Sequence, residues 1–138
     1  MRYEVWEKTV PEEIKADQLW SLRIYRTALY AGETARRDAH WLASKPACAE
    51  LARQLASATE SISANIAEGY SRAARKDRGR FFEYALGSAR EARDWYFKAR
   101  PYLGAHATHA RLALLTTIIK VMIVLVSKSR PMTVAMEA

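Results

Sequence analysis

The chain has 138 residues, a formal net charge of +7 and a residue content that is 50% hydrophobic. This length fits one domain that buries a core without disulfides or metal ions. Five Gly and four Pro are too few for a fold of many short strands and turns, so the composition predicts long helices. The single cysteine, Cys48, excludes an intramolecular disulfide and a Cys-rich zinc site, and without a secretory signal pattern we expect a cytoplasmic protein.

The first half of the chain predicts a short lead-in and two helices. Residues 1–16 include Pro11 and are expected to form an irregular lead-in. Asp17 is a plausible N-cap for a helix over 17–39, with Leu19, Leu22 and Leu29 on its buried face. A second helix is expected over 47–69, with Gly69 as a left-handed C-terminal cap. Its predicted buried line is Leu51, Leu55, Ala58, Ile62 and Ile66.

The second half predicts two more helices, over 75–103 and 107–127, followed by a flexible tail over 129–138. Six residues of the first of these helices recur at helical spacing and should be buried: Phe82, Ala85, Ala89, Ala92, Tyr96 and Ala99. Gly104 should end that helix. Because the links between the long helices are short, we predict an all-α, up-down-up-down antiparallel four-helix bundle over 17–128.

The longest apolar run, residues 112–126, contains about 15 residues, whereas a membrane span needs about 20. Lys120 lies inside the run, and Arg111 and Lys128 flank it. We therefore expect a helix that is buried on most of its circumference and does not cross a membrane. A lone bundle covers such a helix only in part, so self-association would supply the remaining cover.

Residues 57–69 form the most informative stretch of the sequence. Ser57, Ser61, Asn65 and Glu68 recur every three or four residues and would form a polar stripe beside the apolar line. Asn65 has a poor helix propensity, which a specific hydrogen bond would have to offset. The alternative is that Asn65 and Glu68 only cap or satisfy nearby backbone groups.

A wider motif runs from this stretch into the next predicted helix. Its residues are Ser61-Ile62, Asn65-Ile66-Ala67-Glu68-Gly69, Arg72, Phe81-Phe82, Gly87-Ser88 and Glu91. The motif resembles that of the small four-helix bundle proteins encoded within intervening sequences of bacterial 23S rRNA genes. Ser63 departs from the proline that is frequent in that family, and the loop before the second helix lacks the expected proline-and-glutamate pattern. Neither departure changes the expected fold.

This fold is also similar to that of the accessory variability proteins of diversity-generating retroelements. The resemblance implies a basic homopentamer that associates with nucleic acid and with a reverse transcriptase. For the intervening-sequence proteins themselves, the resemblance implies no biochemical activity.

The positive charge is concentrated in residues 70–104, where nine Lys or Arg face four acids. We take these nine as candidate nucleic-acid-binding residues: Arg72, Arg75, Lys76, Arg78, Arg80, Arg90, Arg93, Lys98 and Arg100. Aromatic residues among them could stack on unpaired bases, although most should belong to the core: Tyr70, Phe81, Phe82, Tyr84, Trp95 and Tyr96. We expect Arg72, Arg75, Arg78 and Arg80 to contact a partner without supporting the core.

Sites for catalysis and for cofactors are not apparent. No Glu-x-x-His pair suits a carboxylate-bridged di-metal bundle, and His106 and His109 alone are a weak metal motif. We therefore expect neither an enzyme nor a bound cofactor. Three hypotheses remain open. The first is a protein that binds nucleic acid or a ribonucleoprotein, and the second is a protein-only assembly module whose basic surface docks an acidic protein. The third, which the absence of these motifs disfavours, is an enzyme whose site the sequence does not reveal.

Overall fold

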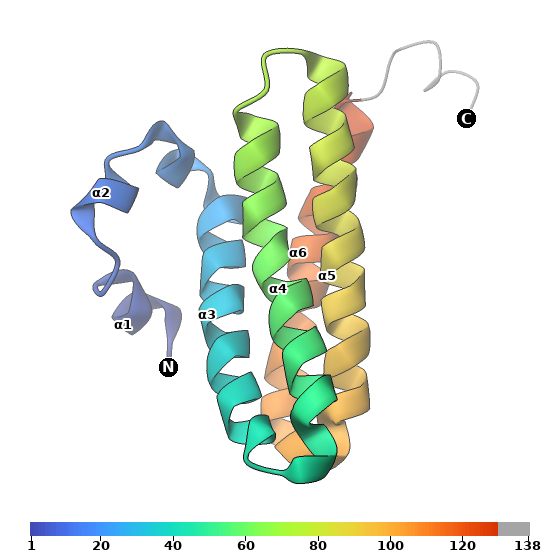
Figure 1. The fold of residues 1–138 in the computed structure, drawn as a ribbon. Coiled ribbons are helices and arrows are strands. Elements are labelled where there is room, and N and C mark those ends of the chain that lie inside the picture. Colours follow the sequence, from blue (N-terminus) through green and yellow to red (C-terminus); the bar gives the residue numbers. More distant parts are fainter. Residues whose placement is uncertain (130–138) are drawn as a thin grey trace.

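The computed structural model describes residues 1–129 and is helical throughout, without strands in that range (Figure 1). The elements in chain order are α1 (Tyr3–Glu7), α2 (Glu12–Lys15), the 3-10 turn η1 (Gln18–Ser21), α3 (Arg23–Ala43), the 3-10 turn η2 (Pro46–Cys48), α4 (Ala49–Tyr70), α5 (Arg75–Leu103) and α6 (Ala105–Ser129). The expected tail over 129–138 begins at the last residue of α6, and its other residues lie outside the described range.

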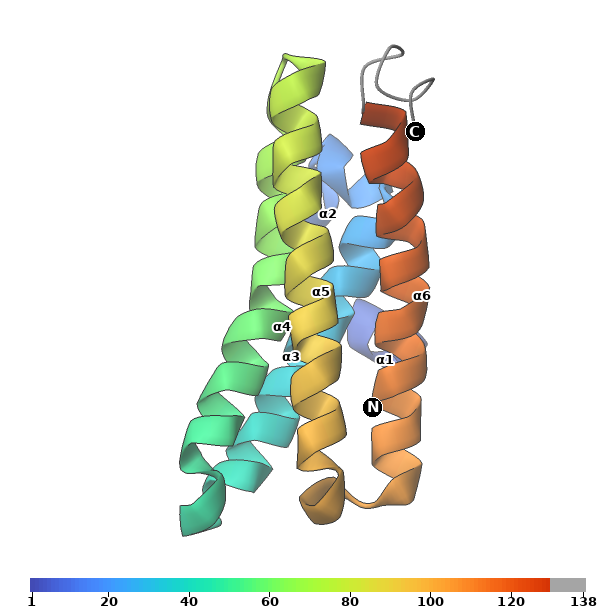
Figure 2. The same ribbon diagram turned by 90° about the vertical axis from the view of Figure 1, so that its right-hand side faces the viewer.

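The four long helices form an antiparallel bundle. α4 packs extensively against α3 and α5, and α5 packs against α6, whereas α3 and α6 touch much less. Figure 2 shows α5 and α6 together on one side of the molecule, with α3 behind them. The bundle is therefore less tightly closed along the α3 and α6 side than elsewhere.

Small and large side chains alternate between the helices of the core. α3 and α5 bury mainly alanines, whereas α4 and α6 bury larger residues such as Ile62, Ile66, Ile118 and Met122. Alanine lets neighbouring backbones approach, and the larger side chains fill the space between them. All six core residues predicted for α5, from Phe82 to Ala99, are buried, which confirms the predicted face of that helix.

The predicted face of the first long helix is right only in part, because Leu19 is buried and Leu22 packs against the core but both precede α3. α3 buries Ile24, Ala28, Ala31 and Ala35, whereas Leu29 is only half-buried. The expected helix start at residue 17 is also wrong, because the Asp17 carboxylate accepts a hydrogen bond from the Leu19 backbone N–H at 2.9 Å and caps only η1. Leu22 is then extended, with ψ at 111°, so α3 begins at Arg23 and ends at Ala43.

The N-terminal residues are more ordered than the irregular lead-in that we expected, because they contain α1 and α2. This segment lies against the outside of α3 (Figure 1). Trp6 is buried there, and its ring lies 5.5 Å from the Tyr30 ring and 6.3 Å from the Trp20 ring. The Tyr30 hydroxyl donates a hydrogen bond to the Met1 carbonyl at 2.6 Å. These contacts are made by aromatic residues of different segments, so helical spacing within one segment could not predict them.

Gly69 is not a left-handed cap, because α4 continues through Tyr70 and Gly104 is the glycine with a positive φ in the described chain, at 85°. The reason for glycine at position 69 is packing against α5. A Cβ there would lie 2.8 Å from a carbon of the Phe82 ring and 3.1 Å from the Arg78 carbonyl oxygen. Gly69 thus allows the end of α4 to approach the start of α5.

A partly buried polar network joins three helices. The Asp38 carboxylate accepts hydrogen bonds from the Tyr96 hydroxyl at 2.7 Å and from Arg111 Nε at 2.7 Å. Burial, and then the Asp38 charge, raise the pKa of Tyr96 well above its ordinary value, and the hydrogen bond to Asp38 raises the pKa of Arg111. The network connects α3 to α6, which otherwise touch little.

α6 is less covered than the sequence predicted. We expected burial on most of its circumference, but in its most apolar 18-residue stretch only 28% of the residues are buried. Val121, Ile123 and Val124 are among its exposed residues. Among the described helices, α6 alone is long and apolar enough to cross a membrane. Core helices of soluble proteins meet the same criteria of length and composition. The prediction failed because α5 covers one face of α6 and α3 adds little.

Candidate nucleic-acid interface

The net positive charge belongs to one side of the bundle. α5 and α6 together carry eleven Lys or Arg and four acids, an excess of seven that equals the net charge of the whole chain. α3 and α4 together carry five Lys or Arg and five acids. α5 and α6 pack against each other, so the excess lies on two neighbouring helices. We call the exposed faces of these two helices the basic surface.

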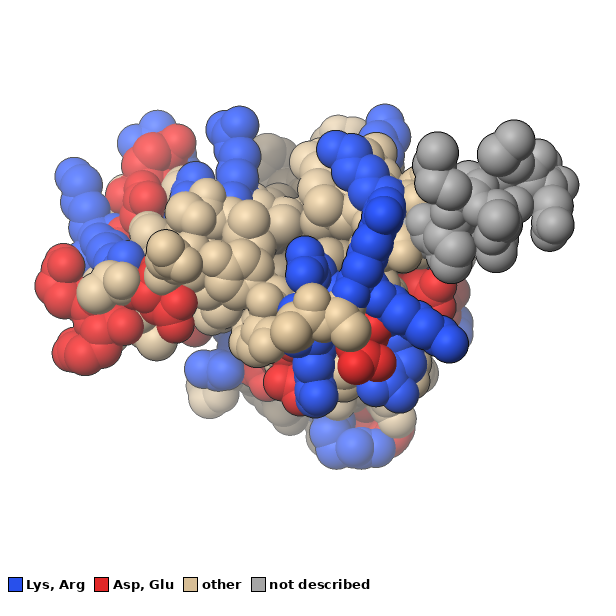
Figure 3. All heavy atoms as spheres, turned by 90° about the horizontal axis from the view of Figure 1, so that it is seen from above, with Lys and Arg blue, Asp and Glu red and all other residues tan. Residues whose placement is uncertain are grey.

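The basic surface extends to the end of the bundle where α4 leads into α5. Figure 3 views this end, and long Lys and Arg side chains project from it with some acids between them. Not all of the nine candidate residues are available to a partner, however. Their intramolecular contacts divide them into three groups.

Arg75 and Arg78 form the first group, because both make contacts within the fold. The Arg75 guanidinium donates to the Lys128 carbonyl at the C-terminal end of α6, with Nε at 3.0 Å. Arg78 Nη2 donates to the Ala73 carbonyl at 3.3 Å, and its Nε is buried without a hydrogen-bond partner in the described range. These two arginines satisfy backbone groups at the helix ends, so the geometry does not favour the expectation that they contact only a partner.

Arg72, Arg80 and Lys98 form the second group, which combines exposed ion pairs with aromatic contacts. Arg72 bonds Glu68 at 2.7 Å, Arg80 lies 3.8 Å from Asp77, and Lys98 lies 2.7 Å from Asp94. Such exposed pairs contribute little to stability, about 0–1 kcal/mol, so a phosphate can replace the carboxylate at small cost.

Lys76, Arg90, Arg93 and Arg100 form the third group and pair with no carboxylate in the described range. Arg93 donates to the Thr116 hydroxyl at 3.2 Å, and Arg100 donates to the Phe97 carbonyl at 2.8 Å. Lys76 and Arg90 are exposed. Lys76 and Arg90, which make no such contact in the described chain, are therefore the best placed to contact an anion.

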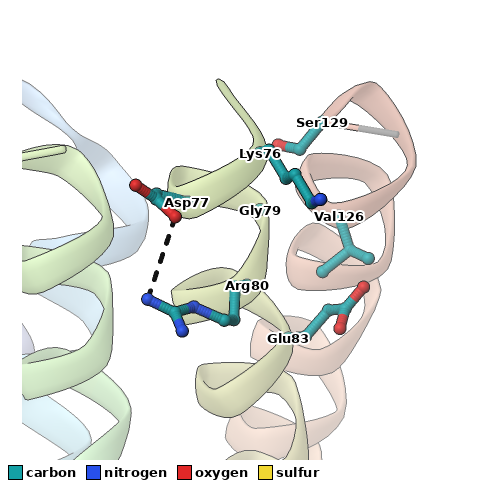
Figure 4. Close-up of a pocket in the computed structure, with 7 residues that line it drawn as sticks. All are labelled: Lys76, Asp77, Gly79, Arg80, Glu83, Val126 and Ser129. Atoms are coloured by element: carbon teal, nitrogen blue, oxygen red, sulfur yellow. Dashed lines mark ion pairs between the residues drawn. The ribbon is translucent and has the colours of Figure 1, made fainter. Parts of the chain in front are cut away.

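Three grooves of the described chain lie between α5 and α6, of which two are lined by several charged residues. A groove of about 440 Å³ is lined by Arg90, Arg93, Asp94, Phe97, Leu112 and Thr116. A second, of about 340 Å³, lies where α5 begins and α6 ends. Figure 4 shows Lys76 and Glu83 beside α6 in this second groove, whereas Arg80 turns away toward Asp77. The first groove is therefore the more positive of the two.

The family-motif residues have mainly structural surroundings. The Asn65 side-chain amide donates to the Ser61 carbonyl at 2.9 Å, and the Ser61 hydroxyl donates to the Ala58 carbonyl at 2.9 Å. These bonds favour the interpretation that Asn65 satisfies nearby backbone. Gly87 and Glu91 are exposed and Ser88 is half-buried, all on α5.

The aromatic candidates differ in their exposure to solvent. Phe82 and Tyr96 are buried, as expected, whereas Tyr70 and Tyr84 are exposed and Phe81 and Trp95 are half-buried. Two exposed aromatic residues of α5, Phe97 and Tyr102, were not among the candidates. Their positions fall outside the buried line of α5, which is the signal that could have identified them.

A metal site is not evident in the range that the structure describes, because no three His, Cys, Asp or Glu side chains gather there. His106 and His109 are both exposed at the start of α6.

Comparison with known proteins identifies the family. A family model described as 23S rRNA-intervening sequence protein matches residues 40–123, which run from the end of α3 into α6. The chain belongs to this family.

The family assignment agrees with the resemblance found in the motif. A crystal structure of a protein of unknown function from the S23 ribosomal protein family of Bacteroides thetaiotaomicron has a similar fold, with a TM-score of 0.69 and 20% identity. The likeness covers 75% of this chain and 97% of that chain, and at this identity it shows the fold alone. No curated protein matches the chain. The relation to retroelement accessory proteins stays a prediction.

Proposed function

We propose that this 23S rRNA-intervening sequence protein binds nucleic acid through the basic surface of α5 and α6 and has no catalytic role. The observation that carries the proposal is the charge division, in which these two helices hold the whole net charge. A surface with one sign of charge attracts a polyanion and speeds its encounter with the protein. Arginine, which predominates there, can bind phosphate through two parallel hydrogen bonds.

Lys76 and Arg90 offer the sharpest test, because both are exposed and neither forms an ion pair or side-chain hydrogen bond in the described chain. We expect Lys76→Glu combined with Arg90→Glu to weaken binding of a labelled single-stranded oligonucleotide at least about tenfold in fluorescence anisotropy. The matched control is Arg23→Glu combined with Arg37→Glu, two exposed arginines of α3. It makes the same change in net charge on the other side of the bundle.

The two double variants separate local contact from total charge. If both weaken binding equally, the basic surface is not the site. If the wild-type protein binds no RNA or DNA at low salt, the nucleic-acid proposal is wrong, and binding of an acidic protein becomes the better explanation of the charge.

We also propose that the chain self-associates through the exposed apolar side of α6. The supporting observation is the 28% burial of the most apolar part of that helix. Water contact with this many apolar side chains is costly, and a second copy would remove them from water. The resemblance to retroelement accessory proteins implies a pentamer, and a reverse transcriptase as partner rests on the same resemblance.

A further inference from the structure

We infer that the nucleic acid bound by this protein is single-stranded, and that its unpaired bases stack on a strip of aromatic side chains along α5. The inference rests on the proposed function and specifies its ligand. The strip consists of Phe81, Tyr84, Trp95 and Tyr102, which we call the aromatic strip.

The aromatic strip occupies one side of α5. Its positions fit the series 81, 84, 88, 91, 95, 98 and 102, in which steps of three and four residues alternate, so all of these residues lie on one helix face. From Phe81 to Tyr102 the helix rises about 31 Å, at 1.5 Å for each residue. This length accommodates several nucleotides.

The rings of the strip are accessible. Tyr84 is 51% exposed and Tyr102 is 41% exposed, whereas Phe81 and Trp95 are half-buried. The Phe81 and Tyr84 rings meet edge to face at 5.6 Å. Trp95 also packs against the hydrophobic core, and two arginines already lie over the Phe81 ring, whereas Tyr84 and Tyr102 are exposed and outside the core. The rings of Tyr84 and Tyr102 are therefore the ones that remain available for a ligand.

Cations accompany the rings. The Arg72 and Arg80 guanidinium groups lie 4.8 and 5.1 Å from the centre of the Phe81 ring, and Lys98 Nζ lies 4.7 Å from that of Trp95. A cation beside an aromatic ring suits a nucleotide, because the phosphate meets the charge while the base stacks on the ring or on the guanidinium plane.

This arrangement favours a single strand over a duplex. In a duplex, the bases stack on one another and present only their edges in the grooves, so they cannot lie flat on a side chain. An unpaired base that stacks on an aromatic side chain contributes about 1–3 kcal/mol by alanine substitution, with little dependence on sequence. The aromatic strip adds this contribution only when the bases are unpaired.

The experiment uses the full chain and three labelled probes of about 20 units: oligothymidylate, an abasic oligodeoxynucleotide and a DNA duplex. The abasic probe keeps the phosphates and lacks the bases, so it measures the contribution of charge alone. By fluorescence anisotropy at one salt concentration, we expect oligothymidylate to bind at least about tenfold more tightly than the abasic probe.

Two pairs of variants locate the effect. Tyr84→Ala combined with Tyr102→Ala should weaken binding of oligothymidylate at least about fivefold and leave binding of the abasic probe unchanged. Tyr84→Phe combined with Tyr102→Phe keeps the rings and should bind as the wild type does. Trp41→Ala is the control on α3, because Trp41 is exposed and has Lys45 Nζ 4.3 Å from its ring centre.

The outcomes separate the two proposals. Equal affinity for all three probes, or an unchanged affinity of the double alanine variant, would overturn the stacking inference while nucleic-acid binding stands. Tighter binding of the duplex would overturn it as well. If none of the probes binds, the proposed function itself fails.

Discussion

The two halves of the bundle differ in what they leave on the surface. α3 and α4 balance their charges and expose two large hydrophobic residues, Trp41 and Tyr70. α5 and α6 hold the whole net charge and expose six: Tyr84, Phe97, Tyr102, Val121, Ile123 and Val124. Packing within the bundle alone accounts for the surface of α3 and α4. α5 and α6 carry a net charge and exposed apolar side chains that the packing of the bundle does not require. We therefore expect partners to bind there.

The two helices of the second half also differ from each other. The exposed faces of α5 combine cations with aromatic rings, whereas α6 exposes aliphatic residues and contains no acid. These surfaces suit different contacts, a polyanion on α5 and a second copy of the chain on α6. Substitutions confined to one helix or one half of the bundle can therefore break this division.

The largest effect is expected for assembly. Val121→Gln combined with Val124→Gln should convert the oligomer to a monomer without unfolding it, because both residues are exposed in the single chain. Size-exclusion chromatography with light scattering measures the mass, and circular dichroism measures the helix content. Trp41→Gln, in the other half of the bundle, should leave the mass unchanged. A monomeric wild-type protein, or a double variant that keeps its mass, would contradict the role given to α6.

The polar network of Asp38, Tyr96 and Arg111 should contribute most to the contact between α3 and α6. Asp38→Ala leaves the Arg111 charge unpaired, and we expect it to lower the free energy of unfolding by about 3 kcal/mol in urea titrations. Asp94→Ala removes an exposed partner of Lys98 instead and should cost less than about 1 kcal/mol. Equal losses in the two variants would show that the network does not hold α6 against α3.

Two glycines of the family motif should respond oppositely to an added methyl group. Gly69→Ala forces a Cβ to within 2.8 Å of the buried Phe82 ring, so we expect a loss of about 1–3 kcal/mol in chemical denaturation. Gly87→Ala meets nothing within 4 Å and should stabilise α5 by up to about 1 kcal/mol. Stabilisation by both substitutions would contradict the tight packing of α4 against α5.

A smaller effect should appear at alkaline pH. Burial and Asp38 raise the pKa of Tyr96 above its ordinary value of 10.0, so the folded protein keeps this hydroxyl protonated while the unfolded chain ionises. The stability that this hydroxyl contributes is present below about pH 10 and is lost as the pH rises further. Tyr96→Phe should therefore be less stable than the wild type at pH 8, and the difference should shrink at about pH 11. If the difference in stability between the two proteins did not change with pH, the Tyr96 hydroxyl would have the same pKa in the folded and unfolded chains.

The sequence predicted α5 well because its buried residues keep a regular helical spacing from Phe82 to Ala99. It failed for α3, where Ile24 and a row of alanines form the buried face, whereas the prediction relied on the more hydrophobic Leu29, which is only half-buried. The burial of α6 was overestimated for a related reason. The hydrophobicity of a helix indicates that some of its surface should be buried. How much of that surface is buried depends on the arrangement of the neighbouring helices.

The candidate site was predicted in outline, because charge can be counted along the chain. Which cations are engaged could not be predicted, since the contact between Arg75 and the Lys128 carbonyl joins residues 53 positions apart. The exposure of Tyr84 and Tyr102 likewise depends on which face of α5 meets its neighbours. Local spacing therefore located the basic surface, and only the fold separated residues that hold helix ends from residues that face a partner.

The salt dependence of single-strand binding tests the central claim most directly. If the basic surface binds phosphates, the logarithm of the association constant should fall linearly with the logarithm of the salt concentration, by about 0.7 for each phosphate neutralised. Lys76→Glu combined with Arg90→Glu should make this slope shallower, and Arg23→Glu combined with Arg37→Glu should leave it unchanged. Binding that does not respond to salt, or no binding at all, would contradict the account.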